Sequence, residues 1–167
     1  KRIFVFFGGT DPKNLTLLAL DVLSKKIFSK IKVDVVIGSN NPSKNKIKNL
    51  VLRRKNTRLY IQIKNMATIM NKADLAIGAG GINIWERICL KLYAIVITSA
   101  ENQIQTIKGL HQAGYLTYLG DHEKIKKTIL EKCLKQNLSV KQFNDKNNLQ
   151  LDGQGVQRIV KLLISKT

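Results

Sequence analysis

Two glycine-rich turns hold the residues of this sequence whose types and spacing could do chemistry. One follows the apolar run at 75–77 and contains Gly78, Gly80 and Gly81, and the other, at 8–14, has the sequence GGTDPKN. Glycine lets the backbone come close to a ligand, and the free amides that open a helix bind anions such as phosphate. The two turns therefore indicate a diphosphate site. Glycine also serves in plain tight turns, and the spacing alone does not separate the two interpretations.

The known phosphate-binding patterns narrow the choice of ligand. The P-loop pattern GxxxxGK[ST] is absent, which disfavours ATP or GTP hydrolysis. The dinucleotide pattern GxGxxG is incomplete, because Asn83 occupies the position of its third glycine, and this disfavours NAD binding. The ligand that remains possible is another nucleotide, whose diphosphate would contact Gly80 and Gly81. Glu86 follows at the start of the expected helix, where a carboxylate can accept hydrogen bonds from ribose hydroxyls. The alternatives for Glu86 are a first-turn acid that stabilises the helix dipole and an ion pair with Arg87.

The elements that must position these turns alternate along the chain. Continuously apolar, β-branched runs predict buried strands, and the segments between them have the period of amphipathic helices. This alternation predicts an α/β fold, a Rossmann-like doubly wound parallel sheet of about six strands with helices on both faces. Ligands bind such sheets outside the carboxyl ends of the strands, where both glycine turns would lie. The expected strands are 3–7, 33–37, 59–63, 75–77, 94–98 and 115–119.

Helix signals agree with this alternation. Asp11 is expected to be the N-cap of the first helix, with the following proline at its first position, and Gly114 to follow a later helix. Asp121 and Asp152 are expected to cap the next two helices. The segment 138–148 has no clear period and predicts a polar excursion. With no internal repeat or domain boundary, residues 1–167 are expected to form a single domain.

The formal net charge of +18 invites a second class of function, a basic module that binds nucleic acid or an anionic surface. The span from Val35 to Ala73 has no acidic residue. The lysines of 43–54 fall mostly off the apolar face of their helix, and aromatics make up only 6% of the chain, so a platform for stacking bases is lacking. We therefore expect no specific nucleic-acid partner, only nonspecific polyanion affinity at low salt.

No metal and no cofactor are expected. Cys89, His111, His122 and Cys133 lack the spacing of zinc ligands, and both histidines are expected to be structural or solvated. No apolar run reaches the roughly 18 residues of a membrane span, and the start lacks the pattern of a secretory signal. The sequence therefore predicts a soluble cytoplasmic protein without a membrane span.

Three stretches together resemble a known family: ADLAIGAGGINIWERICLKLYAIVITSAENQ at 73–103, FVFFGGTDPKN at 4–14 and LDGQGVQRIV at 151–160. They are similar to the C-terminal domain of the UDP-sugar hydrolases of bacterial pseudaminic acid biosynthesis, within the MurG-like GT-B superfamily. The resemblance implies the UDP-binding half of a two-domain enzyme that hydrolyses UDP-2,4-diacetamido-2,4,6-trideoxy-β-L-altropyranose. A UDP-sugar-dependent GT-B glycosyltransferase is the alternative, because the residues that would distinguish the two lie in the other domain.

The resemblance also implies roles for individual residues. Gly80, Gly81 and Asn83 would hold the diphosphate, and Glu86 the ribose. The backbone at 64–66, ending at Met66, would meet the uracil. The remaining expected contacts, with phosphate or sugar, are Gly9, Thr10, Asn102 and Gln103.

Three departures from the family pattern limit this transfer. The usual GGST turn continues here as Ile82 and Asn83, and Ile82 has no hydroxyl to offer. The usual Gly-x-Pro after the next helix is replaced by residues 91–93. The third departure is that the family's proposed catalytic base, a histidine, belongs to an N-terminal domain that this chain does not contain. No catalytic residue is therefore expected within 1–167, and the fragment alone is expected to be inactive.

Overall fold

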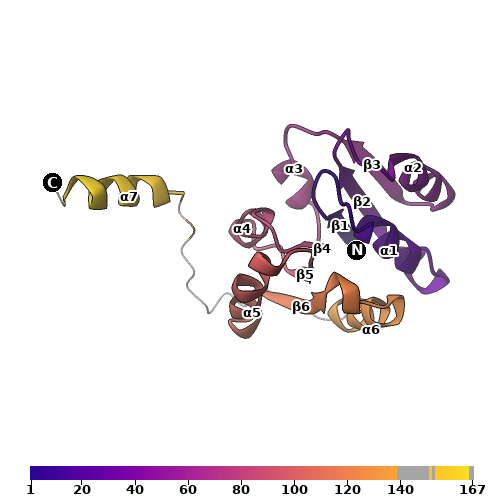
Figure 1. The fold of residues 1–167 in the computed structure, drawn as a ribbon. Helices are drawn as coiled ribbons and strands as arrows, with labels where there is room; N and C mark the ends of the chain where they lie inside the picture. Colours follow the sequence, from indigo (N-terminus) through magenta and orange to yellow (C-terminus); the bar gives the residue numbers. More distant parts are fainter. Residues whose placement is uncertain (139–150, 152, 166–167) are drawn as a thin grey trace.

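A parallel sheet of six strands forms the centre of the computed structural model, which describes residues 1–138, 151 and 153–165 (Figure 1). The strand order β3-β2-β1-β4-β5-β6 is that of the doubly wound Rossmann fold. All neighbouring strands run parallel. The predicted fold class is confirmed. The strands are β1 (Arg2–Phe6), β2 (Lys32–Ile37), β3 (Thr57–Ile61), β4 (Leu75–Ala79), β5 (Ala94–Thr98) and β6 (Leu116–Asp121).

Helices cover both faces of this sheet (Figure 1). On one face lie α1 (Leu15–Leu23), α2 (Lys44–Arg53) and α6 (Lys127–Leu138). On the other lie α3 (Ala67–Met70), α4 (Asn83–Cys89) and α5 (Ile104–Gln112). The remaining elements are α7 (Gly155–Ile164) and the short 3-10 helices η1 (Lys26–Phe28), η2 (Glu101–Gln103) and η3 (His122–Lys124).

The core is divided by the sheet into two layers. Successive strand residues point to opposite faces, so Ile3 and Val5 of β1 pack under α1 while Phe4 packs under α4 and α5. All three side chains are fully buried. Continuous apolar runs suit strands covered on both faces, which is why the sequence located all six strands.

The helix starts differ from the prediction in one respect. Asp11 is not the N-cap of α1: it lies upstream with φ of 42°, and its carboxylate accepts hydrogen bonds from the amides of Leu15 (3.0 Å) and Thr16 (2.8 Å). Asp121 accepts from the Glu123 amide and so caps η3 rather than α6. Asp152 lies outside the described residues, as does the expected polar segment beyond Leu138.

Left-handed residues end two of the helices. Gly114 follows α5 with φ of 80°, as expected for a helix C-terminus. Lys91 follows α4 with φ of 53°, a conformation that glycine adopts at lower cost. Lys91 therefore makes the turn into β5 that Gly-x-Pro makes in the family, at the cost of a left-handed backbone conformation.

The last helix, α7, has an apolar face that is not buried. Val156 and Val160 are 71% and 45% exposed, and Ile159 and Leu163 are similarly open to solvent. Figure 1 shows α7 apart from the helices that cover the sheet. Within the described residues, none of the helices combines the length and apolar character that crossing a membrane requires.

A buried guanidinium joins the elements around β2. Arg54, at the end of α2, is 8% exposed and donates hydrogen bonds to the carbonyls of Leu23 (2.9 Å), Phe28 (2.8 Å) and Ile31 (3.0 Å), and to Thr57 Oγ1 (2.7 Å). These acceptors belong to α1, η1, the turn into β2, and β3. The planar, five-donor shape of arginine is what allows one side chain to reach all four.

We expect Arg54→Lys to lower the free energy of unfolding by about 2–4 kcal/mol, because an ammonium cannot reach the same acceptors and leaves buried carbonyls unpaired. Arg53→Lys, at the exposed neighbouring position, is the matched control and should change stability by less than about 0.5 kcal/mol. Urea unfolding followed by circular dichroism measures both. Equal stabilities of the two variants would contradict this role of Arg54.

Candidate functional site

The centre of the sheet contains a topological switch point. β1 and β4 are neighbours, with Phe6 paired to Gly78, but β1 leads to α1 on one face and β4 leads to α4 on the other. The loops that leave these two strands therefore diverge, and a crevice opens between them at the carboxyl ends of the strands. Both glycine turns predicted from the sequence lie here.

A cavity of about 350 Å³ occupies this crevice. It is lined by three of the predicted residues: Met66 from the segment before α3, Gly81 from the turn between β4 and α4, and Asn83 from the start of α4. Gly8, from the turn after β1, lines it from the other side. The complete lining is Phe6, Gly8, Met66, Ala79, Gly81, Ile82, Asn83 and Arg87.

Gly78 is required by close packing beneath the cavity. A Cβ atom on Gly78 would lie 2.3 Å from the Phe6 carbonyl oxygen and 2.5 Å from Arg87 Nη2, distances that real Cβ atoms do not reach. Glycine at this position therefore admits the Arg87 side chain under the turn, and no larger residue fits without movement of the backbone.

The next two glycines are packed against α5 and η2. A Cβ on Gly80 would lie 2.6 Å from Ile107 Cγ1 and 3.4 Å from Gln103 Oε1, and one on Gly81 would lie 3.9 Å from Gln103 Nε2. Gln103 is itself held by the Ser99 amide, which donates to its Oε1 at 3.2 Å. Of the predicted sugar or phosphate contacts, Gln103 thus lies beside the turn, whereas Asn102 is exposed on η2.

The turn after β1 lines the cavity through Gly8, which was not among the predicted contacts. Gly8, with φ of 98°, lines the cavity, while Gly9 and Thr10 are exposed and are not among its lining residues. The Gly9 carbonyl instead accepts a hydrogen bond of 2.8 Å from the Gly38 amide. Gly9 therefore joins this turn to the end of β2 and leaves Gly8 facing the switch point.

Asn83 and Glu86 form a pair at the start of α4. Asn83 Nδ2 donates to Glu86 Oε2 at 2.5 Å, and Glu86 forms no ion pair with Arg87 within the described part of the chain. Asn83 does not cap the helix, because the N-cap residue is Ile82. The buried Asn83 Oδ1 has no hydrogen-bond partner among the described residues, so it can still accept one.

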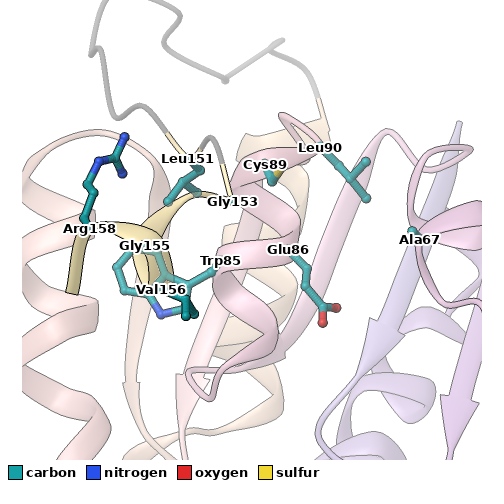
Figure 2. A pocket seen from close by; sticks show the side chains of 10 residues that line it. All are labelled: Ala67, Trp85, Glu86, Cys89, Leu90, Leu151, Gly153, Gly155, Val156 and Arg158. Atoms are coloured by element: carbon teal, nitrogen blue, oxygen red, sulfur yellow. The ribbon is translucent and has the colours of Figure 1, made fainter. Parts of the chain in front are cut away.

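A second cavity, of about 570 Å³, lies on the outer side of α4 (Figure 2). Its lining includes Glu86, the hydrogen-bond partner of Asn83, and Ala67, which follows Met66 in the sequence. Asn83 and Met66 themselves line the first cavity. Trp85 extends toward Val156 at the start of α7, whereas Glu86 leaves α4 on the side that faces Ala67 (Figure 2). The Asn83–Glu86 hydrogen bond therefore connects the borders of the two cavities.

Arg87 is a site residue that sequence reasoning missed. Its side chain is fully buried, and it donates to the carbonyls of Phe6 and Ala79, both at 3.3 Å. Burial lowers the pKa of the guanidinium to about 10, while the charge of Glu86 acts to raise it, so Arg87 is a cation at neutral pH. The sequence around Arg87, which directly follows Glu86, does not indicate that the arginine is buried. The one sequence feature that could have indicated its burial is Gly78, because a glycine there leaves room for the arginine side chain.

The two histidines are not part of either cavity. His111 is exposed and its Nδ1 lies 3.1 Å from the Leu116 carbonyl oxygen, and His122 lies beside Asp121 after β6. Across the described residues, no group of three or more His, Cys, Asp or Glu side chains is placed to hold a metal ion.

The six-stranded order and the crevice at its switch point define the chain as a Rossmann-like domain with the fold of the C-terminal half of GT-B proteins. Residues 2–163 match the model of the glycosyltransferase family 28 C-terminal domain, and the chain belongs to this family. Among solved structures, MurG from Acinetobacter baumannii has a TM-score of 0.74 at 16% identity, covering 98% of this chain and 49% of MurG.

Another structural neighbour is the UDP-GlcNAc 2-epimerase of Neisseria meningitidis bound to UDP-GlcNAc, with a TM-score of 0.70 at 16% identity; the match covers 99% of this chain and 44% of the epimerase.

Two curated relatives confirm the resemblance seen in the sequence. The spore coat polysaccharide biosynthesis protein SpsG of Bacillus subtilis is 31% identical over 121 residues, 72% of this chain and 36% of SpsG. The UDP-2,4-diacetamido-2,4,6-trideoxy-β-L-altropyranose hydrolase of Campylobacter jejuni is 32% identical over 113 residues, 67% of this chain and 39% of the hydrolase. The matches thus span little more than a third of the length of these relatives.

We expect Gly78→Ala to lower the free energy of unfolding by about 1–3 kcal/mol or more, because the added methyl group overlaps the Phe6 carbonyl and the Arg87 guanidinium. Gly109→Ala is the matched control: it lies in α5 with open space around it, and alanine there should stabilise the domain by about 0.5–1 kcal/mol. Thermal and urea unfolding measure both. A Gly78→Ala domain as stable as the wild type would refute the close packing of β1, β4 and Arg87.

Proposed function

We propose that this domain binds the UDP portion of a nucleotide sugar at the switch point between β1 and β4. The observation that supports this most directly is the cavity whose lining includes both glycine turns, Gly8 on one side and Gly81 on the other. Backbone amides at such turns bind phosphate oxygens, and a buried guanidinium lies beneath them. The Neisseria neighbour of the same fold is described as bound to UDP-GlcNAc, which agrees with a ligand of this class.

In the proposed complex the ligand extends across both cavities. The diphosphate lies against Gly80 and Gly81, with Asn83 beside it and with Gly9, Thr10, Asn102 and Gln103 nearest the phosphate or sugar. The ribose hydroxyls bind Glu86, whose carboxylate is exposed and has free acceptor positions beyond the Asn83 bond. The uracil lies against the backbone that ends at Met66.

For the full-length protein we propose a cytoplasmic UDP-sugar hydrolase of the kind found in pseudaminic acid biosynthesis. The Campylobacter relative is named for this hydrolysis, and SpsG for polysaccharide biosynthesis. Water would be activated by a general base outside this chain, in an N-terminal partner domain, because neither His111 nor His122 lines the cavities. The role of this domain would be to hold UDP and to stabilise the charge on it as the sugar leaves.

A UDP-sugar-dependent glycosyltransferase is the second candidate, and the family description favours it. Such an enzyme would use the same UDP contacts and would transfer the sugar to an acceptor instead of water. Full-length protein incubated with the UDP-sugar distinguishes the two activities: a hydrolase releases UDP and free sugar without an acceptor, whereas a transferase requires one.

We expect calorimetric titration at about 150 mM salt to show saturable UDP binding that Glu86→Ala weakens about tenfold or more, because a charge-assisted hydrogen bond contributes about 1.5–3 kcal/mol. Glu123→Ala removes another exposed carboxylate, from η3, and is the matched control, with affinity unchanged. Partly exposed Trp85 offers a fluorescence signal for the same titration. Binding of a short RNA, with UDP inert, would overturn this proposal and favour the basic-module alternative.

A further inference from the structure

Arg87 stands out among the buried side chains because it carries a charge that the described residues compensate only through the nearby charge of Glu86, without an ion pair. It is 0% exposed, and no carboxylate among the described residues forms an ion pair with it. Its two hydrogen bonds, to Phe6 O and Ala79 O, are both 3.3 Å long, at the weak end of the range for N–H···O bonds. Its Nε has no hydrogen-bond partner within residues 1–138, 151 and 153–165.

A purely structural role explains this arrangement poorly. Two weak bonds to backbone carbonyls could be made by a neutral donor, whereas burying an unpaired cation carries a large desolvation cost. Arg54 shows how this fold satisfies a guanidinium that serves structure: it uses all three of its nitrogens on five protein acceptor contacts. Arg87 has the same donors and leaves them largely unused.

The position of Arg87 indicates where a counter-charge would come from. Arg87 lines the switch-point cavity together with Gly8 and Gly81, and it reaches this place only because residue 78 is glycine. An anion in the cavity would lie above a cation that is shielded from bulk water, where Coulomb attraction is stronger and salt screening weaker than at the surface.

We propose that Arg87 is the fixed counter-charge of the diphosphate and makes this site selective for a nucleoside diphosphate over the uncharged nucleoside. The inference rests on the proposed UDP site and deepens it, because it assigns the selectivity for ligand charge to one residue. Arg87 acts from beneath the cavity, through its charge, on the charge of the ligand. Its contribution therefore grows with the negative charge of the ligand and leaves recognition of the nucleoside unchanged.

The test is calorimetry of the domain with uridine, UMP and UDP at about 150 mM salt. In the wild type, affinity should rise from uridine to UDP. Arg87→Met, a neutral and shorter unbranched side chain, should weaken UDP binding at least tenfold and UMP binding less, while uridine binding changes by less than twofold. Arg87→Lys keeps the charge and should retain part of the UDP affinity. Arg53→Met removes the same charge from the surface of α2 and should leave all three affinities within twofold.

A direct measurement makes the proposal independent of how well the variants fold. The Arg87 Nε–H resonance, assigned by NMR in the wild type, should shift when UDP or inorganic pyrophosphate is added and stay in place with uridine. An unmoved resonance at saturating UDP, or an equal loss of affinity for all three ligands in a folded Arg87→Met domain, would overturn the proposal.

Pyrophosphate separates failure of this inference from failure of the proposed function. If the wild type binds neither UDP nor uridine but binds pyrophosphate in a manner lost in Arg87→Met, the nucleotide assignment fails and the anion site at Arg87 stands. If UDP binds with the same affinity in Arg87→Met, the nucleotide assignment stands and Arg87 has no part in it. If none of these probes binds, both fail.

Discussion

The close approach of β1 and β4 at their carboxyl ends is the constraint on which the site depends. Phe6 and Gly78 are paired across these strands, and the missing side chain at Gly78 leaves room for the Arg87 guanidinium. The same pairing separates α1 from α4 on opposite faces and so opens the crevice. This pair of residues therefore adjoins both the cavity, which Phe6 lines, and the buried Arg87 side chain.

In the proposed complex, this arrangement would divide ligand binding between the backbone and the side chains. The turns around Gly8 and Gly81 bring main-chain groups to the cavity, whereas charge comes from below, through Arg87, and hydrogen-bonding capacity comes from Asn83 and Glu86 at its border. Because the cation is held inside the protein, most of the reorganisation that the proposed anion binding requires would be completed when the domain folds. The net charge of +18 adds long-range attraction for any anionic ligand, but it cannot select among them.

The sequence predicted the fold more fully than the site, for physical reasons. Continuous apolar runs located every strand, because strands covered on both faces are mostly apolar, and glycine placed the two turns. In the first turn Gly8 lines the cavity, whereas the predicted contact was Gly9, because adjacent glycines are equivalent in sequence and only the folded backbone distinguishes them. Arg87 was missed because its burial depends on Gly78, nine positions earlier, and on a strand 81 residues away.

The order of the strands has a further consequence, for how the domain folds. β1 lies between β2 and β4, so its second neighbour is synthesised only after two intervening strands and the helices between them. Closing so long a loop costs conformational entropy before the strand pairing can offset it, and contacts of this kind slow folding. We expect the half-sheet β1–β3 to form early and the pairing of β1 with β4 to be the late step. The binding site would then be absent from partly folded chains and would mark the native state.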